Sequence, residues 1–414
     1  MPAVAAATAF TSVVQTDSRW MLRTGDGRLW RARGVEKVNG YGPDCGPLGR
    51  PYAAALAQAG LSRDAWCART AGRLKEWGFN LLGTACDSRL NAGDSFATTE
   101  MIAISSWMRD RGPDHLIAVN PSSPCGPVAN AFHPDFAAVC DKAAEACCRP
   151  HRGERNFLGY FLDNELNWWG TGAWWTCGLL DAALEKLPAS HPAHAAAVRI
   201  LAAAPDRAAA RVAYTEELAR TYFGTIAAAI RRHDPDHLIL GVRFAGVAGA
   251  PDPVWRICGA FCDVVSLNCY PNADPAAGTL SLDVAGPILP TGWKRTGDWT
   301  PVPLAAMLER RFAVAGRPLF ISEWSFRGAD AGRPRRESNG QELPVQADRA
   351  RAIALFLREM DRLPYVVGHA FYKWTDDLFP SASGGGPETL NWGLVSLGDV
   401  PYVKAVQAFR EEAK

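Results

Sequence analysis

The chain has 414 residues, 48% of them apolar, and a formal net charge of +1. The length and composition allow a large packed core, and the near-neutral charge gives no reason to expect a nucleic-acid partner or an anionic membrane surface. No stretch approaches the roughly 20 consecutive apolar residues of a membrane helix. The first residues are small and apolar but lack a cationic start, so a secretory signal is not predicted.

The eleven cysteines are scattered through apolar segments and match no zinc-binding spacing. We therefore expect buried, reduced thiols, and with them a cytoplasmic location, or a periplasmic or secreted one if the natural N-terminus was trimmed. Neither a metal nor another cofactor is predicted. The sequence does not indicate an oligomeric state.

A short apolar run followed by a helical pattern recurs along the chain, as in the helical stretches 208–232 and 346–362. Eight such runs predict an α/β fold of the (β/α)8 TIM-barrel type, forming one catalytic domain over 29–414 after an N-terminal arm of residues 1–28. An open doubly wound sheet is the rival, but no Gly-rich phosphate turn follows the first run. The eight expected strands are 29–36, 79–84, 115–120, 158–165, 237–244, 264–270, 319–324 and 366–374.

The fourth and seventh runs each end near a glutamate, Glu165 and Glu323. On strands three steps apart around a ring of eight, the two side chains are expected to face each other across the barrel mouth. Asn164 precedes Glu165, and adjacent strand residues point to opposite faces. The chain must therefore leave regular strand geometry here if both side chains are to enter one pocket.

Two carboxylates across a cleft lined by indoles meet the requirements of glycoside hydrolysis, in which one protonates the leaving oxygen and the other attacks or activates water. Flat aromatic faces stack on pyranose rings, so Trp168 and Trp169, which follow Glu165, are expected to line the cleft. The expected partner is a carbohydrate substrate. The alternative is that both glutamates are ordinary strand-end acids in salt bridges.

Five sequence blocks resemble, in order, the β-agarase-type enzymes of glycoside hydrolase family fifty, within the clan A glycoside hydrolases. They are GYFLDNELNWWG, DPDHLILGVRFAG, DVVSLNCYPN, ISEWSFRGADAGRP and NWGLVSLGDVPY. The resemblance covers the chain from about Leu29 and implies a retaining β-glycosidase that hydrolyses galactose-containing oligo- or polysaccharides by double displacement. Other clan A specificities (β-glucosidase, mannosidase or glucuronidase) and a non-catalytic glycan-binding barrel stay open.

The resemblance also implies residue roles. Glu165 would be the general acid/base and Glu323 the nucleophile. Asn164 would hydrogen-bond the sugar 2-hydroxyl, and Tyr270 would donate to Glu323. The environment must then separate the pKa values of the two glutamates.

Other residues have less specific signals. Asn268 shares the polar strand face with Tyr270 and is expected at the barrel mouth. Glu36 is expected either to bind sugar hydroxyls or to form a buried ion pair. Arg243 is expected to steady Glu323, to bind a hydroxyl, or to form a salt bridge at the mouth. Trp374, rather than Phe371, is expected to form the floor beneath the sugar.

Two loops complete the expected site. Trp174 and Trp175 are expected either as subsite walls or as a hydrophobic plug. The Arg-rich segment 326–341 is expected either as a solvated lid or as a reader of anionic sugar substituents. Asp163, deeper in the fourth run, is expected to be structural.

Overall fold

A computed structural model of the chain describes residues 9–17, 19–120, 123, 125–170, 178–284, 300–331, 340–381 and 386–413. Its central feature is a parallel sheet of nine strand segments in the order β10-β9-β6-β5-β4-β19-β16-β12-β11. In chain order these are β4 (Ala32–Val35), β5 (Leu81–Leu82), β6 (Ala97–Met101), β9 (Phe157–Phe161), β10 (Leu238–Ile239), β11 (Phe244–Ala245), β12 (Val265–Asn268), β16 (Leu319–Trp324) and β19 (Val366–Phe371).

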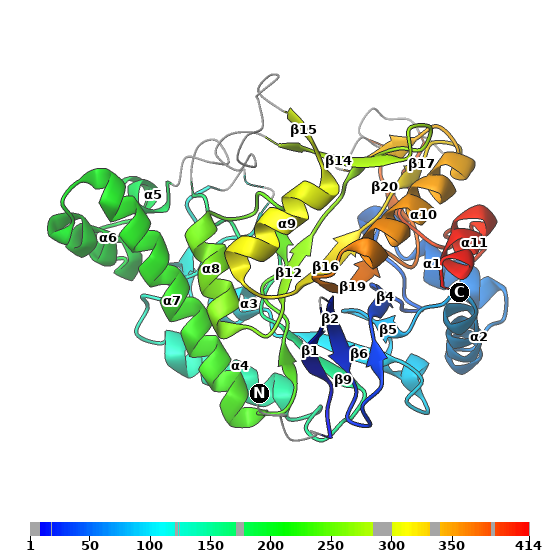
Figure 1. The fold of residues 1–414 in the computed structure, drawn as a ribbon, viewed down its shortest axis with the longest axis horizontal. Helices are drawn as coiled ribbons and strands as arrows, with labels where there is room; N and C mark the ends of the chain where they lie inside the picture. Colours follow the sequence, from blue (N-terminus) through cyan, green and yellow to red (C-terminus); the bar gives the residue numbers. More distant parts are fainter. Residues whose placement is uncertain are drawn as a thin grey trace.

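The two ends of this sheet come from one continuous run, 238–245, because β10 pairs with β9 and β11 pairs with β12. This run bonds to the chain on both sides: Leu162 N donates to Gly241 O at 2.9 Å, and Val264 N donates to Ile239 O at 3.2 Å. The sheet therefore curls round on itself, with helices on its outer face (Figure 1). The expected α/β barrel architecture is confirmed at this level.

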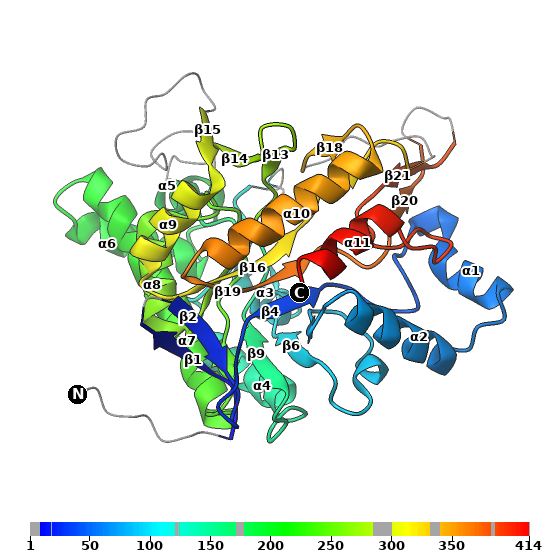
Figure 2. The same ribbon diagram turned by 45° about the vertical axis from the view of Figure 1, so that its right-hand side comes forward.

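Helices follow most barrel strands and cover the outside of the sheet. The long helix α7 illustrates why: Asp206 caps its N-terminus by accepting from Ala209 N at 2.8 Å, and Tyr214, Leu218 and Ile226 lie on its buried face. Figure 2 shows α10 and α11 side by side over β16 and β19. The helices are α1 (Pro51–Gln58), α2 (Arg63–Glu76), α3 (Ile104–Arg109), α4 (Phe136–Cys148), α5 (Leu179–Lys186), α6 (Pro192–Ala203), α7 (Arg207–His233), α8 (Asp252–Phe261), α9 (Leu304–Ala315), α10 (Gln346–Arg362) and α11 (Val403–Glu411).

Short strands and 3-10 turns form the loops that follow the barrel strands. They are η1 (Gly46–Leu48), η2 (Ser88–Asn91), η3 (Pro113–His115), β7 (Leu116–Ile117), β8 (Val128–Ala129), β13 (Asn272–Asp274), β14 (Thr279–Val284), β15 (Thr300–Pro303), β17 (Arg327–Gly328), β18 (Glu342–Leu343), β20 (Asp377–Phe379) and β21 (Glu388–Leu390). No helix in the described part of the chain is long and apolar enough to cross a membrane. The ten described cysteines are free thiols, and the cytoplasmic location stays a prediction.

The prediction of the third barrel strand was wrong. The segment expected there, 115–120, instead supplies β7, which pairs antiparallel with β8 outside the barrel sheet. The strand between β5 and β9 is β6, whose sequence ATTEM is only partly buried. Because β6 lacks the continuous apolar run typical of a strand buried on both faces, the apolar pattern could not identify it.

The described residues of the expected N-terminal arm, 1–28, include two strands. β1 (Ser12–Thr16), β2 (Arg19–Arg23) and β3 (Leu29–Trp30) form a separate antiparallel sheet, dark blue in Figure 1. Leu22 packs into a hydrophobic cluster with Ala32 and Leu81 of the barrel strands. Trp20 N donates to Pro364 O at 2.7 Å. This small sheet covers the N-terminal end of the barrel.

Candidate active site

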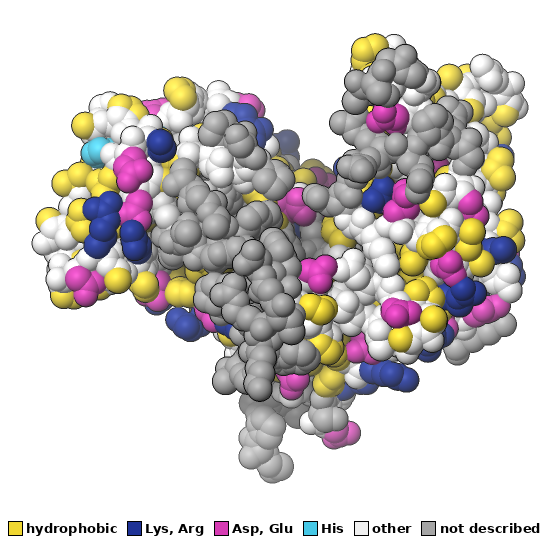
Figure 3. Space-filling model, turned by 90° about the horizontal axis from the view of Figure 1, so that it is seen from above, with side chains coloured by type: hydrophobic (Ala, Val, Ile, Leu, Met, Phe, Trp, Pro, Cys, Tyr) yellow, Lys and Arg dark blue, Asp and Glu magenta, His cyan; other side chains and the backbone are white. Residues whose placement is uncertain are grey.

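A cavity of about 750 Å³ lies at the C-terminal ends of the barrel strands. Its lining includes Glu165 just after β9, Glu323 in β16, and Tyr372 just after β19. This is the end of the barrel at which active sites form. The face of the molecule seen from above is deeply indented (Figure 3).

Glu165 reaches this cavity because the chain leaves strand geometry, as expected. Its φ is +50°, in the left-handed region. Backbone bonds hold the residue on two sides: Glu165 N donates to Arg243 O at 3.0 Å, and Gly126 N donates to Glu165 O at 2.8 Å. The turn brings the Glu165 carboxyl and the preceding Asn164 amide into contact with the same side chain, Asn268.

The half-buried Glu165 carboxyl lies in an environment that favours its protonated form. Burial raises its pKa, and the charge of Glu323 raises it further. Asn268 Nδ2 donates to Glu165 Oε1 at 2.9 Å, which partly opposes this effect. The balance suits an acid that must carry a proton before the reaction starts.

Glu323 lies in a contrasting environment on β16. Its Oε1 accepts from the Arg243 guanidinium, and its Oε2 accepts from the Tyr270 hydroxyl at 2.6 Å. Burial and the Glu323 charge raise the pKa of the Tyr270 phenol, so the tyrosine stays a donor. A carboxylate with a guanidinium donor on one oxygen and a hydroxyl donor on the other is held in one orientation.

Asn164 is fixed by two donors to one oxygen. Arg243 Nε and Asn268 Nδ2 donate to Asn164 Oδ1 at 2.8 and 3.1 Å. Asn268 is itself oriented by Ser322, whose Oγ donates to Asn268 Oδ1 at 2.8 Å. The amide orientation of Asn164 is therefore determined, and its Nδ2 is the group left to donate to a substrate hydroxyl.

Glu36 was expected either to bind sugar hydroxyls or to form a buried ion pair, and in the structure it forms the ion pair. The side chain is 1% exposed, so it does not reach sugar hydroxyls as a substrate-binding residue would. Its Oε1 accepts from Arg243 Nη1 at 3.1 Å, and its Oε2 accepts from Thr84 N at 2.9 Å. Arg243, 2% exposed, thus contacts Glu36, Glu323 and Asn164 together.

The two tryptophans expected to line the cleft are packed elsewhere. Trp168 is fully buried against α7, where its ring stacks on Phe223 at 5.8 Å and meets Tyr222 edge-on. Trp169 is 7% exposed, and its Nε1 donates to Ala248 O at 2.6 Å. Both belong to the main core, and neither is among the described residues that line the cavity.

Trp374 is also in the core, not beneath the cavity. It is fully buried, stacks on Trp77, and donates from Nε1 to the Tyr52 hydroxyl at 2.8 Å. Phe371, the alternative, lies at the end of β19 under α11, against Phe409. The expected aromatic floor is therefore assigned to neither residue.

The aromatic wall is formed instead by Tyr270, Tyr372 and Trp392. Tyr270 lies 5.6 Å from Trp392 and 6.4 Å from Tyr372 between ring centroids. All three line the cavity. Trp392 lies inside the block NWGLVSLGDVPY, so sequence similarity marked its segment, but no local pattern showed that it would face Tyr270.

Asp163 has the structural position expected of it. It accepts from Tyr222 Oη at 2.6 Å and from Ser105 N at 3.1 Å, and burial raises its pKa to about 7. Trp174, Trp175 and half of the Arg-rich segment 326–341, namely residues 332–339, lie outside the described residues.

One group of described side chains has the composition of a metal site: Asp114, His115 and His133. The two imidazole rings are tilted against each other, with centroids 3.7 Å apart and an interplanar angle of 30°. His133 Nδ1 also accepts from Asp135 N at 3.1 Å, which places the proton of the neutral ring on Nε2. The geometry does not fit a metal centre.

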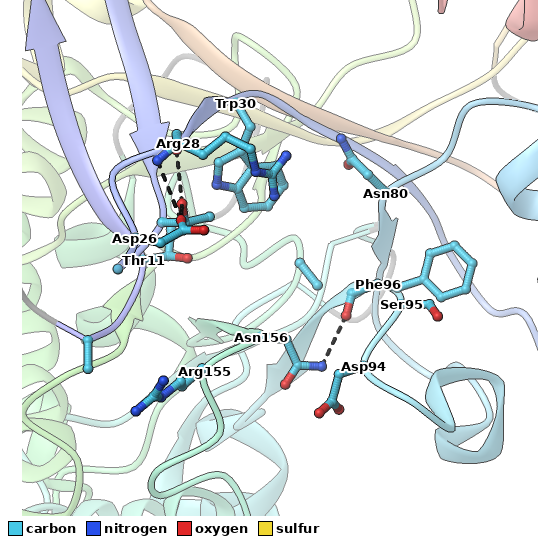
Figure 4. A pocket seen from close by; sticks show the side chains of 14 residues that line it. Thr11, Asp26, Arg28, Trp30, Asn80, Asp94, Ser95, Phe96, Arg155 and Asn156 are labelled. Atoms are coloured by element: carbon cyan, nitrogen blue, oxygen red, sulfur yellow. Dashed lines mark hydrogen bonds between the residues drawn. The ribbon is translucent and has the colours of Figure 1, made fainter.

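A second cavity, of about 610 Å³, lies at the opposite end of the barrel (Figure 4). Its lining includes Trp30, Asn80 and Asn156, which precede β4, β5 and β9. The hydrogen bonds drawn there stay within the protein, as where Asn156 Nδ2 donates to Phe96 O at 3.1 Å. Its lining includes the carboxylates Asp26 and Asp94, but this is the end of the barrel at which active sites do not form, so we do not assign the chemistry to this cavity.

Comparison with known proteins finds related agarases. No family model matches the chain. The chain is 26% identical over 417 residues to β-agarase A of Vibrio sp. (strain JT0107), and the alignment covers 90% of this chain and 38% of that protein. It is 24% identical over 398 residues to β-agarase B of the same strain, and that alignment covers 88% of this chain and 37% of that protein. The solved structure of the agarase AgWH50C superposes with a TM-score of 0.75 at 19% identity, covering 98% of this chain and 63% of that one.

The chain thus spans less than two fifths of the length of the two Vibrio relatives. The likeness to β-agarases that the sequence blocks predict is confirmed.

Proposed function

We propose that the chain is a single (β/α)8 catalytic domain that hydrolyses β-glycosidic bonds with retention of configuration. Glu323 attacks the anomeric carbon as the nucleophile, and Glu165 protonates the leaving oxygen. Glu165 then acts as the base that activates water against the covalent intermediate. Asn164 donates to the sugar 2-hydroxyl, and Tyr270 and Arg243 hold Glu323 in position.

The observation that carries this proposal is the contrast between two carboxyl groups in one cavity. Burial and a neighbouring negative charge raise the pKa of Glu165, whereas Glu323 has a guanidinium and a phenol as donors. A pair of titratable groups whose environments differ in this way divides acid and nucleophile roles between its members. Two strand-end acids in ordinary salt bridges would not need this arrangement.

The proposed substrate is a galactose-containing glycan of the agar type, because the two Vibrio relatives are β-agarases. The cavity chemistry supports a neutral sugar: four described lining residues carry a carboxyl group, and none of the described lining residues is Lys or Arg. The four are Glu165, Asp283, Glu323 and Asp377. A glucuronide would bring another negative charge into this lining, so the acidic wall disfavours that alternative. β-Glucosidase and β-mannosidase activities are the remaining alternatives within the enzyme class.

The test is incubation with neutral agar-derived oligosaccharides and a panel of nitrophenyl β-glycosides, with the first-formed anomer followed by NMR. We expect cleavage with retention. A 2-deoxy-2-fluoro galactoside with a good leaving group should trap the covalent intermediate, and mass spectrometry should find the added sugar on the peptide that contains Glu323. A wild-type protein that binds these glycans and cleaves none would support the glycan-binding barrel instead. An inverted product would rule out the double displacement.

A further inference from the structure

Glu36 is a buried carboxylate at the barrel mouth to which the proposed mechanism gives no task. It lies at the end of β4, on the strand next to β19 and β5. The site makes room for it: a Cβ on Gly83 would lie 2.5 Å from Glu36 Oε1, so only glycine fits there without displacement. Thr84 donates to Glu36 Oε2 from both its backbone N and its hydroxyl.

The Arg243 guanidinium connects Glu36 to the proposed nucleophile. Nη1 donates to Glu36, Nη2 to Glu323, and Nε to Asn164. The three contacts fix the plane of the Arg243 guanidinium. The Arg243 backbone has a φ of +51°, and its N donates to Ser266 Oγ at 2.9 Å. Two carboxylates therefore share one buried positive charge.

We infer that Glu36 is a positioning residue that acts on Glu323 through Arg243; this inference rests on the proposed function. Glu36 anchors the far side of the guanidinium, so that Arg243 holds Glu323 and Asn164 in a fixed relation. It also takes up part of the positive charge. An arginine paired with Glu323 alone would neutralise the nucleophile more completely and weaken its attack.

Burial raises the pKa of Glu36, while Arg243 and the bond from Thr84 work against that rise. The Thr84 donors thus help Glu36 to keep its charge next to Arg243. The charged or titratable groups that face Glu36 are Arg243, Glu323 and the Cys86 thiol. Those whose charge interacts with Glu323 are Glu36, Lys37, Glu165, Arg243, Tyr270 and Tyr372.

The experiment compares pH profiles of kcat and KM for the wild type and Glu36→Gln on the best glycoside found. We expect kcat to fall about tenfold with little change in KM. The acid limb should move to lower pH by about one unit, because removing the Glu36 charge leaves the full Arg243 charge to Glu323. Glu36→Asp keeps the charge but shortens the reach, so its acid limb should stay near that of the wild type while kcat falls.

The matched control is Asp234→Asn, which removes a buried carboxylate at the other end of the barrel. It should lower the melting temperature and leave both the acid limb and KM unchanged. If Glu36→Gln does not fold, Thr84→Val removes the hydroxyl that favours the charged form of Glu36, and should move the acid limb in the same direction by less.

A folded Glu36→Gln variant with wild-type kcat and acid limb would overturn the inference, and so would an unaltered Thr84→Val variant where the first does not fold. Wild-type protein that cleaves no glycoside is a different result, because it removes the proposed function and the inference with it.

Discussion

The two ends of the barrel both bury charged groups, but they arrange them differently. At the N-terminal end, Asp234 pairs with His237 at 2.6 Å and accepts from the Tyr160 hydroxyl at 2.6 Å, so one anion meets its own donors. At the mouth, Glu36 and Glu323 share one arginine. The left-handed φ values of Glu165 and Arg243 also occur at the mouth. The Asp234 network at the N-terminal end suits stability, and the Arg243 network at the mouth keeps the Glu323 carboxylate reactive.

The largest expected effect comes from removing the carboxylates that face the cavity. Glu323→Ala should reduce turnover of every substrate by at least about 1,000-fold, because no covalent intermediate forms. Added azide should restore slow cleavage and give a product of inverted configuration. Glu165→Ala should still release dinitrophenol, a leaving group that needs no proton, and azide should then give a product of retained configuration.

The measurement is leaving-group release together with the configuration of the azide product by NMR. Glutamine variants at both positions serve as controls for shape. Wild-type rates in both alanine variants would contradict the assignment of the two carboxylates.

The second prediction removes the cation that the two carboxylates share. Arg243→Met should lower the free energy of unfolding by about 3–5 kcal/mol at pH 7, because Glu36 and Glu323 both lose the cation that they share. Burial already raises the pKa of Glu36, and protonated Glu36 needs no cation, so the loss should shrink as the pH falls. Urea unfolding at pH 7 and pH 5 measures both effects.

A surface arginine provides the control. Arg232 pairs with Asp141 at 2.6 Å, and both side chains are about half exposed. Arg232→Met should change the free energy of unfolding by about 1 kcal/mol or less, with no loss that depends on Glu36. Equal losses of unfolding free energy in Arg243→Met and Arg232→Met would contradict the claim that the shared arginine at the mouth differs from an ordinary surface ion pair.

The third prediction separates core tryptophans from the cavity wall. Trp168→Ala should cost about 3–5 kcal/mol of stability, because it empties space against Tyr222 and Phe223. Trp392→Ala should mainly raise KM, because its ring lines the cavity beside Tyr270. Chemical unfolding and steady-state kinetics of both variants are the measurements. The opposite pattern, with KM altered in the first variant and stability in the second, would return Trp168 to the cleft.

The sequence predicted features with a local pattern and missed those that depend on distant contacts. Apolar runs located strands such as β16 and β19, whereas β6 was missed because its threonines and glutamate leave one face half exposed. The ends of β9 and β16 identified Glu165 and Glu323. The order of residues after Glu165 could not show that Trp168 turns towards α7.

The same limit applies to the network at the mouth. Glu36 and Arg243 lie 207 positions apart, so no spacing rule connects them. Each could be proposed singly from its strand end. Their contact, and the choice between a hydroxyl ligand and an ion pair for Glu36, needed the folded chain.

The smallest expected effect is at the lower end of the barrel, where Asp234→Asn should cost about 1–3 kcal/mol of stability. Burial opposes the charge of Asp234, but bonds from His237 and Tyr160 lower its pKa from 3.8 to about 2. Its contribution is therefore present above pH 3.8 and is lost as the pH falls towards 2. Burial likewise opposes the charge of His237, but its bond to Asp234 raises its pKa above 6.5. That contribution is present below pH 6.5 and is lost as the pH rises through the raised value.

The difference in unfolding free energy between wild type and the Asp234→Asn variant should thus be greatest near pH 5.5 and smaller at pH 3 and pH 9. Urea unfolding at these three pH values measures it. A difference that is constant with pH would show that the Asp234–His237 pair is not the stabilising unit proposed for this end of the barrel.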